Sequence, residues 1–265
     1  RPPRSTLFPY TTLFRSKMKE LVRAAEKRDM VVILDLHNYC RRFMNNEHTL
    51  IGNNGLTIED LASFWQAIAK EFSTFKNIYG YGLMNEPHDL APETKWFDMA
   101  QASINAIREV DTNTLIMVGG NDWSSAERWI EQSDTLKFLK DPANNLAFEA
   151  HVYFDKDASG TYKYSYEEEE CYPEKGIDRV KPFVEWIKQN KFHGFIGEYG
   201  IPDNDPRWNE TLDLFLGYLQ ENGINGTYWA AGPWWDTYFM AITPKDGKDR
   251  PQMPIIEKYT STLKK

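Results

Sequence analysis

Short apolar runs alternate with helical stripes along this chain, and that alternation most constrains how the chain can fold. From Lys17 onward, segments with the 3.6-residue apolar spacing of a helix separate six runs typical of buried strands. The runs lie at 31–36, 79–84, 114–118, 146–150, 195–197 and 226–230. Strands joined through helices form a parallel sheet, and strands that are apolar on both faces fit a sheet covered on both sides.

The predicted fold is therefore α/β: a (β/α)8 TIM-type barrel, N-terminally truncated, with about six βα units. In such a barrel the chemistry lies at the C-terminal ends of the strands. A doubly wound open sheet is the structural alternative, although no glycine-rich dinucleotide turn follows the first strand. The 265 residues suffice for one large domain, which we place at residues 17–265.

Residues 1–16 are predicted to be a non-native leader. Within 4–16 the letters Ser-Thr-Leu-Phe are nearly repeated as Thr-Thr-Leu-Phe, with the periodicity of neither a helix nor a strand. This pattern is typical of a translated cloning adaptor, which has no part in the fold. The alternative is a natural, loosely structured N-terminus.

Charge and composition narrow the classes of partner. The net charge of −8 disfavours a nucleic-acid partner, because binding a phosphate backbone requires a basic face. No stretch of the sequence is long and apolar enough to span a membrane. Nine Trp residues are present, and several of them fall in predicted loops. Flat indoles pack well against the apolar faces of sugar rings, although an aromatic core is the alternative.

Two further features leave alternatives open. Cys40 and Cys171 each follow a predicted strand by a few residues, so they could form a disulfide in an exported protein or remain free thiols. The four consecutive acids at 167–170 indicate a solvated loop, with a calcium site as the alternative.

Glu86 and Glu198 each follow an apolar run that is predicted to be a strand. Two carboxylates at the C-terminal ends of different barrel strands can face each other across a cleft. Cleavage of a glycosidic bond needs such a pair, one acid to protonate the leaving oxygen and one carboxylate to attack or to activate water. For either glutamate alone, a solvated carboxylate at the end of a loop is the alternative.

Five motifs, each at the end of a predicted strand, carry a resemblance to a known family. They are His37-Asn38-Tyr39, Leu83 to His88, His151-Val152-Tyr153, Ile196 to Gly200, and Tyr228 to Trp235. Together they make the chain resemble glycoside hydrolase family 5 from about Lys17 to its C-terminus, with the closest likeness to endo-β-1,4-glucanases (cellulases).

The resemblance implies a role for several of these residues. Glu86 matches the general acid/base of the family and Glu198 its nucleophile, in a mechanism that retains the anomeric configuration. Retention implies carboxyl groups about 5–5.5 Å apart. Asn85 matches the residue that hydrogen-bonds the sugar 2-hydroxyl, and Tyr153 a tyrosine that donates to the nucleophile. Trp229 matches a sugar-stacking platform.

Other residues are implied to bind substrate. His37 and His151 match histidines that line the subsite beside the nucleophile, and Asn38 and Tyr39 belong to the first of the five motifs. Three tryptophans are candidates for more distant subsites, with packing under loops as the alternative: Trp123, Trp234 and Trp235.

The resemblance implies that no cofactor and no metal are needed. A metal-dependent barrel hydrolase with His37, His151 and Asp155 as ligands is disfavoured, because the His-x-His pairing typical of such barrels is absent.

The expected partner is a β-glucan polysaccharide or oligosaccharide, with neither nucleic acid nor membrane involved. We expect a monomer if the barrel is complete, and secretion because a polymeric substrate cannot enter a cell.

The chain departs from the family pattern before its His-Asn-Tyr motif. The family barrel has two further βα units there, and an arginine at the end of its second strand, for which this sequence offers no counterpart. We therefore expect a fragment that is less stable than the full barrel and associates through open strand edges. Two alternatives follow: an impaired fragment that binds carbohydrate without turnover, or a family member that acts on mannan or xyloglucan.

Overall fold

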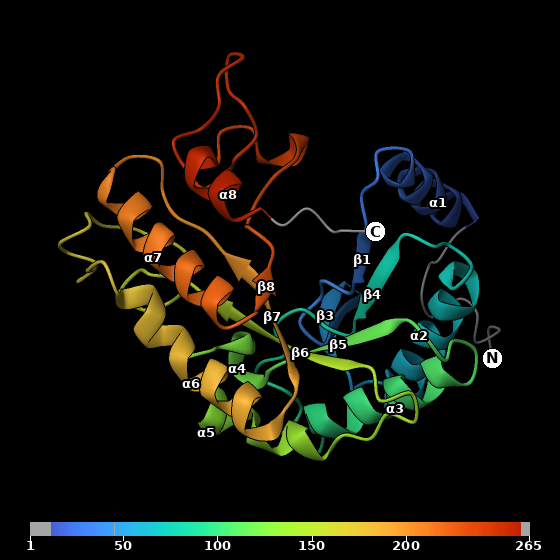
Figure 1. Ribbon diagram of the computed structural model, residues 1–265. Helices are drawn as coiled ribbons and strands as arrows, with labels where there is room; N and C mark the ends of the chain where they lie inside the picture. The colour runs from blue at the N-terminus through green and yellow to red at the C-terminus, as the bar shows by residue number, and fades with distance from the viewer. Residues whose placement is uncertain (1–11, 45, 261–265) are drawn as a thin grey trace. The chain divides into compact units, whose positions relative to one another are not determined.

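The computed structural model describes residues 12–44 and 46–260, which divide into two compact units (Figure 1). The first unit takes the residues up to Trp123 together with Ser133–Ala147. The second takes Ser124–Gln132 and the residues from Phe148 onward. Each unit is described by itself below.

The main sheet has six strands in the order β1-β4-β5-β6-β7-β8. The pairs β1–β4, β4–β5 and β7–β8 are parallel, as expected for strands connected through helices. The predicted α/β fold with a parallel sheet is therefore confirmed. The strands are β1 (Val32–Asp35), β4 (Ile78–Gly82), β5 (Leu115–Gly119), β6 (Leu146–Val152), β7 (His193–Tyr199) and β8 (Asn225–Gly226).

Three helices and a hairpin accompany the strands of the first unit. The helices are α1 (Thr12–Glu26), α2 (Ile58–Phe72) and α3 (Trp96–Arg108). The spacing of Thr57 and Asp60 in the sequence predicts a capping box, and helix α2 begins with one, in which the two residues exchange side-chain and backbone hydrogen bonds. The hairpin, β2 (Arg41–Met44) and β3 (Glu47–Leu50), was not predicted from the sequence.

The second unit contains the longest helix of the described residues. Its helices are α6 (Lys175–Asn190), α7 (Arg207–Glu221) and α8 (Met253–Tyr259), and α6 and α7 lie side by side (Figure 1). Aromatic rings pack edge to face in the core of this unit. The ring centroids of Trp129 and Phe183 are 4.6 Å apart, and those of Phe148 and Trp186 are 5.0 Å apart. The shorter elements of the two units are α4 (Asn121–Ser124) and η2 (Asp134–Phe138), which belong mainly to the first, and α5 (Trp129–Ser133) and η3 (Pro233–Trp235), which belong mainly to the second.

Several predicted boundaries differ from the structure. Helix α1 begins at Thr12, so residues 12–16 of the predicted leader are helical, while residues 1–11 lie outside the described residues. That the leader is non-native stays a prediction. The predicted strand 226–230 is only two residues long, although the Trp229 N–H still donates to the Tyr199 carbonyl at 2.8 Å. The sequence also predicts a last helix from near Met253 to Leu263; the helix begins at Met253 and ends at Tyr259, and Leu263 lies outside the described residues.

Both cysteines are free thiols, so the possible disulfide is not formed. Cys40 is buried, and burial raises the pKa of its thiol to about 12. Cys171 is half-buried, and burial likewise raises its pKa. Neither thiol therefore carries appreciable thiolate at neutral pH.

The sequence predicts that the run of four acids at 167–170 is a solvated loop, but the four side chains are not all exposed. Glu169 is only 3% exposed, and its carboxylate accepts hydrogen bonds from the backbone N–H groups of Lys156 (2.7 Å) and Tyr164 (2.9 Å). Glu167 pairs with Arg207, and Glu170 pairs with Lys156. Glu169 therefore organises the surrounding loop, because a buried carboxylate requires such donors.

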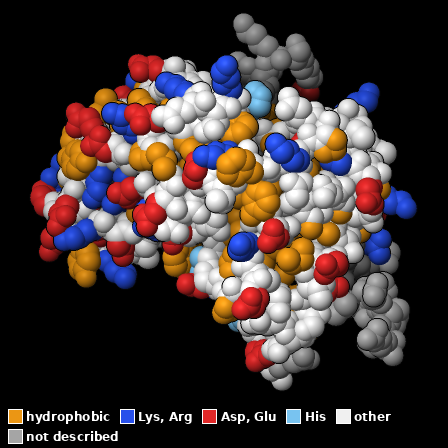
Figure 2. Space-filling view, turned by 90° about the horizontal axis from the view of Figure 1, so that it is seen from below, with side chains coloured by type: hydrophobic (Ala, Val, Ile, Leu, Met, Phe, Trp, Pro, Cys, Tyr) orange, Lys and Arg blue, Asp and Glu red, His pale blue; other side chains and the backbone are white. Residues whose placement is uncertain are grey.

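The surface presents charges of both signs. On the face shown in Figure 2, acidic and basic side chains are interspersed among apolar ones. Such mixing weakens the long-range attraction of this face for a highly charged ligand. The helices of the described residues all lack the length and the apolar character that crossing a bilayer requires.

A buried ion pair between Arg108 and Asp141 holds α3 in the first unit. Their side chains are 3% and 1% exposed, and the guanidinium donates to both carboxylate oxygens, at 2.7 and 2.9 Å. Burial tends to raise the pKa of Asp141, but hydrogen bonds from Arg108 and from the backbone of Asn145 and Ala143 hold it below its ordinary value.

We expect Arg108→Met to lower the free energy of unfolding by about 3–5 kcal/mol, since it leaves the Asp141 carboxylate buried without its cation. The pKa of Asp141 is lower in the folded than in the unfolded protein. The ionised carboxylate therefore stabilises the folded state at pH values above the unfolded pKa, and this stabilisation is lost as the pH falls through the folded pKa. Urea unfolding of the parent protein and of Arg108→Met should show this difference in the free energy of unfolding at pH 7 and a smaller difference in acid. Lys137→Ala, which removes a partly exposed pair with Asp134, should cost less than about 1 kcal/mol. Equal losses for the two variants would contradict the expectation.

Candidate active site

In the first unit, the segments that follow β1 and β4 remain paired beyond the strands. The Asn85 N–H donates to the Leu36 carbonyl at 2.9 Å. This pairing places the Asn85 side-chain nitrogen 3.3 Å from Nε2 of His37, and Nδ1 of His37 lies 3.2 Å from Asp35. Because an amide nitrogen only donates, Nε2 accepts and Nδ1–H donates to Asp35, which fixes a neutral tautomer of His37.

The other residues of this first motif shape a turn. The Asn38 N–H donates to the Leu36 carbonyl at 3.1 Å, and the Asn38 carbonyl accepts from the Arg41 N–H at 2.8 Å. Tyr39 has a left-handed φ of 59°, and its hydroxyl lies 3.3 Å from Nε2 of His37. His37, Asn38, Tyr39 and Asn85, all of them substrate-binding candidates, are thus brought together, while their binding of substrate stays a prediction.

Glu86 is half-buried and follows Asn85, which is only 5% exposed. It lies four residues beyond the end of β4 rather than directly after that strand. Its φ of 46° is left-handed, a conformation that costs a non-glycine residue on the order of 1–3 kcal/mol and is concentrated at functional sites. The turn therefore directs the Glu86 side chain at an energetic cost that the surrounding structure must offset.

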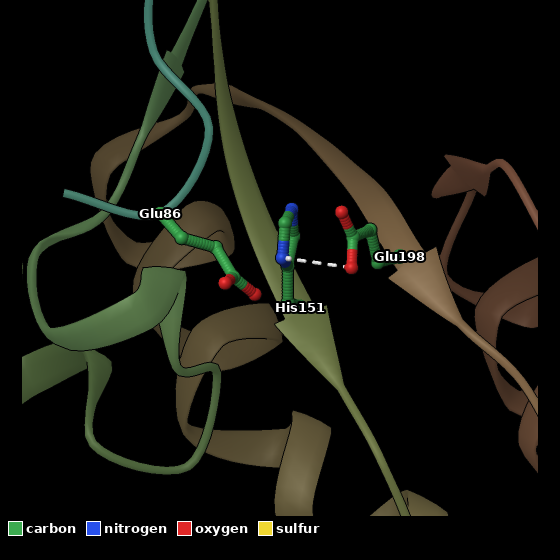
Figure 3. A group of neighbouring side chains, drawn as sticks. All are labelled: Glu86, His151 and Glu198. Carbon is green, nitrogen blue, oxygen red and sulfur yellow. Dashed lines mark ion pairs between the residues drawn. The ribbon is translucent and has the colours of Figure 1, made fainter. Parts of the chain in front are cut away.

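In the second unit, Glu198 is held by two neighbours. It lies inside β7, as the last residue but one, rather than after the strand, and is 8% exposed. The Tyr153 hydroxyl donates to its Oε2 at 2.7 Å, and Nδ1 of His151 lies 3.6 Å from the same oxygen. Figure 3 draws the ion pair of His151 and Glu198, together with Glu86. These neighbours stabilise a buried carboxylate in its charged form.

Glu149 is a member of this cluster that sequence reasoning missed. It precedes His151 by two residues on β6, so both side chains lie on one face of the strand, and Nε2 of His151 is 3.4 Å from its Oε1. A Cβ at Gly197 would lie 1.9 Å from that same oxygen. Gly197, the residue before Glu198, therefore leaves the room that the Glu149 side chain occupies. An acid two residues before a strand-end histidine was the available signal.

Tyr153 is itself supported by its surroundings. Arg179 donates a hydrogen bond to its carbonyl, and Gly160, at φ 71°, lies where a Cβ would be 3.0 Å from its ring. Asp155 accepts from the Gly160 and Thr161 N–H groups, at 3.1 and 3.0 Å. Asp155 therefore organises a loop, and its engaged oxygens give no support to the alternative in which it was a metal ligand.

The four tryptophans that are candidates for sugar binding differ in how far their side chains are exposed. Trp229 and Trp235 are half-buried with ring centroids 4.9 Å apart, and Trp235 lies 5.0 Å from Tyr238. Trp234 is 88% exposed. In the first unit, Trp123 is 42% exposed and stacks on His88. The contacts of Trp235 fit packing as well as sugar binding, whereas Trp123 and Trp234 offer open indole surface.

Within each unit, then, the structure brings predicted residues together. In the first unit these surround His37 and Asn85, and in the second they surround Glu198. The spacing of Glu86 from Glu198 stays a prediction.

Comparison with known proteins places the chain among characterised sequences. The model of the family described as cellulase (glycosyl hydrolase family 5) matches residues 7–234. The endo-beta-1,4-glucanase B of Aspergillus niger is 31% identical over an alignment of 262 residues, which covers 97% of this chain and 74% of that protein.

Solved structures of endoglucanases are also similar to this chain. The crystal structure of an endoglucanase of Pseudomonas stutzeri aligns with a TM-score of 0.87 at 39% identity, over 95% of this chain and 75% of that one. The same enzyme in complex with cellobiose gives a TM-score of 0.86 at 41% identity, over 94% and 73% of the two chains. These relatives are (β/α)8 barrels, so the predicted barrel type is confirmed, with six βα units in the described residues.

Proposed function

The chain belongs to the cellulase family, glycosyl hydrolase family 5, and from this premise we propose that it hydrolyses internal β-1,4-glucosidic bonds of cellulose or a related β-glucan. The observation that carries the proposal is the buried Glu198 carboxylate, which accepts a 2.7 Å hydrogen bond from Tyr153. A carboxylate held charged in this way is suited to attack an anomeric carbon.

In the first step of the proposed mechanism, Glu198 attacks the anomeric carbon while Glu86 protonates the departing glycosidic oxygen. The bond from carbon to that oxygen breaks, and a covalent glycosyl-enzyme forms. In the second step Glu86, now ionised, takes a proton from water, which attacks the same carbon and releases Glu198. Two inversions give net retention of configuration.

The proposed roles of the neighbouring residues follow from their contacts. Asn85 would donate to the sugar 2-hydroxyl, since its amide is already oriented by His37. His151 would stabilise the ionised nucleophile from its other side, since its Nδ1 lies 3.6 Å from Glu198. Trp229 would stack on a sugar ring. All of these steps use side chains alone, so the mechanism needs no metal or organic cofactor.

Location and assembly are also proposals. A cellulose chain is too large to cross a membrane, so we place the enzyme outside the cell. One chain supplies both glutamates, and the proposed mechanism therefore calls for no second subunit.

A panel of soluble polysaccharides tests the proposed function. The purified chain should release reducing sugar from carboxymethyl cellulose and lower its viscosity early, as internal cleavage does. Proton NMR should show the β-anomer forming first, because retention is expected. Hydrolysis of mannan or xyloglucan alone would overturn the proposed substrate. Binding of cellulose without any release of sugar would overturn the proposed activity in favour of a binding function.

A further inference from the structure

We propose that Tyr162 is a positioning residue, which sets the distance from Tyr153 to the carboxylate of Glu198 by joining the ends of β6 and β7. The proposal rests on the proposed function, since it concerns the residue that donates to the nucleophile of the same enzyme. Tyr162 lies in the loop that follows β6, outside the five motifs of the sequence. The residues that carry the proposal all belong to the second unit.

The Tyr162 hydroxyl bridges the backbone of the two strand ends. It accepts a hydrogen bond from the Phe154 N–H at 2.9 Å and donates one to the Gly200 carbonyl at 2.6 Å. β6 and β7 are neighbours in the sheet, where an N–H of one strand ordinarily pairs directly with a carbonyl of the next. The hydroxyl therefore stands between two such groups and sets how far the strands separate where they end.

Both ends of this bridge lie beside residues of the candidate site. Phe154 directly follows Tyr153, and Gly200 lies two residues beyond Glu198. The Tyr153 hydroxyl spans the same gap between the strands when it donates to Glu198 at 2.7 Å. A side-chain contact of about 3.6 Å is no longer a hydrogen bond, so a shift of about 1 Å between the strand ends is enough to break this one.

The buried hydroxyl of Tyr162 is suited to a fixed structural link. Tyr162 is 8% exposed, and burial raises the pKa of its hydroxyl well above the ordinary value. The hydroxyl therefore keeps its proton at neutral pH and remains a donor. A phenol has one proton to give and can accept in return, so the two backbone groups satisfy it in both roles.

The loop that carries Tyr162 is held by Asp155, which is 1% exposed. The Asp155 carboxylate accepts from the Tyr162 N–H at 3.2 Å, in addition to its bonds from Gly160 and Thr161. Tyr162 has a left-handed φ of 44°, and its ring packs edge to face on Trp208, with centroids 5.0 Å apart. Residues other than glycine adopt this conformation rarely and at an energetic cost, so the surrounding contacts fix Tyr162 in place.

Tyr162→Phe tests the proposal, since it keeps the ring and removes only the hydroxyl. An aryl cellobioside with an acidic phenol needs no protonation, and stopped-flow release of this phenol gives the rate of glycosyl-enzyme formation. The rate at saturating substrate should fall about 10-fold, because a small misplacement of a catalytic group is costly. The half-saturating concentration should stay within about 2-fold, since a hydroxyl bound to two backbone groups is not available to the sugar.

Tyr166→Phe is the matched control. Tyr166 is also buried, its hydroxyl lies 3.0 Å from that of Thr211, and its ring likewise packs on Trp208. Both substitutions remove a buried hydrogen bond, so both should lower the midpoint of thermal unfolding. Tyr166→Phe should nevertheless keep the rate within about 2-fold of the parent, since it releases no strand end. Equal losses of rate in the two variants would reduce the part of Tyr162 to stability alone and overturn the proposal.

A double-mutant cycle shows whether Tyr162 acts through Tyr153. In a Tyr153→Phe background, which lacks the bond to Glu198, Tyr162→Phe should change the rate by less than about 2-fold. A further loss of about 10-fold in this background would contradict the positioning role, because independent effects add. If Tyr162→Phe does not fold, Asp155→Asn takes its place as a gentler change to the same loop, and its loss of about 3-fold should vanish in the same background.

A measurement without turnover completes the test. Tyrosines labelled with ¹³C at Cζ report the hydrogen bonding of each hydroxyl by NMR, and Tyr153→Phe identifies the signal of Tyr153. In Tyr162→Phe this signal should move toward the position that it takes in Glu198→Ala, and in Tyr166→Phe it should stay in place. An unmoved signal in a folded Tyr162→Phe protein would show that Tyr162 does not position Tyr153.

The outcomes separate this proposal from the proposed function. If the parent protein releases no phenol, the proposed function is overturned, whereas the labelled signal still decides whether Tyr162 holds Tyr153 beside Glu198. If the parent is active and Tyr162→Phe is equally active, the positioning role alone is wrong.

Discussion

Glu198→Gln should abolish hydrolysis of soluble β-1,4-glucan, with a loss in kcat on the order of 10⁶-fold, as removal of a nucleophile does in other hydrolases. The substitution keeps the size of the side chain and its place in β7, but it replaces a charged carboxylate by a neutral amide. An amide does not form the glycosyl-enzyme, so the two-step route is closed. Reducing-sugar assays of the purified variant measure the loss directly.

Glu168→Gln is the matched control for this substitution. Glu168 is exposed and accepts hydrogen bonds from Ser165, outside the proposed site. Its replacement makes the same chemical change and should leave kcat within about 2-fold, as a surface substitution usually does. If Glu198→Gln retained more than about a tenth of the activity, a nucleophilic role for Glu198 would be untenable.

Glu86→Gln should lower kcat on polysaccharide about 10²- to 10⁴-fold, the usual contribution of general acid catalysis. The size of the loss should depend on the leaving group. An aryl cellobioside with an acidic phenol needs no protonation, so its first step should stay fast. The second step should be slow, since Glu86 also activates water, and the phenol should then appear in a burst.

The comparison of the two substrates decides the role of Glu86. Stopped-flow release of the phenol measures the burst, and steady-state assays give kcat for both substrates. A loss of the same size on both substrates, without a burst, would show that Glu86 does not act as the acid. Glu198→Gln should give no burst with the aryl cellobioside, which distinguishes the two glutamates.

The local periodicities of the sequence determined the class of the fold. Apolar runs at 31–36 and 114–118 lie within one residue of β1 and β5 at either end, because runs of β-branched and other apolar residues favour an extended strand. The Thr57–Asp60 capping box marked the start of α2, because its hydrogen bonds span only three residues. Polar motifs at the strand ends likewise marked the candidate site, since parallel strands carry their chemistry at one end.

Pairings between distant residues were decided by the tertiary structure alone. The bond from Tyr153 to Glu198 joins residues 45 positions apart, and the room that Gly197 leaves for Glu149 depends on two strands lying beside each other. His88 and Trp123 stack only because a left-handed turn follows β5. The sequence indicates that Glu169 is a solvated acid, whereas in the structure its side chain is buried and accepts hydrogen bonds from backbone N–H groups 5 and 13 residues away. Sequence periodicity reports which face of an element is apolar, whereas the partner of a polar side chain depends on strand register and loop path, which no local pattern encodes.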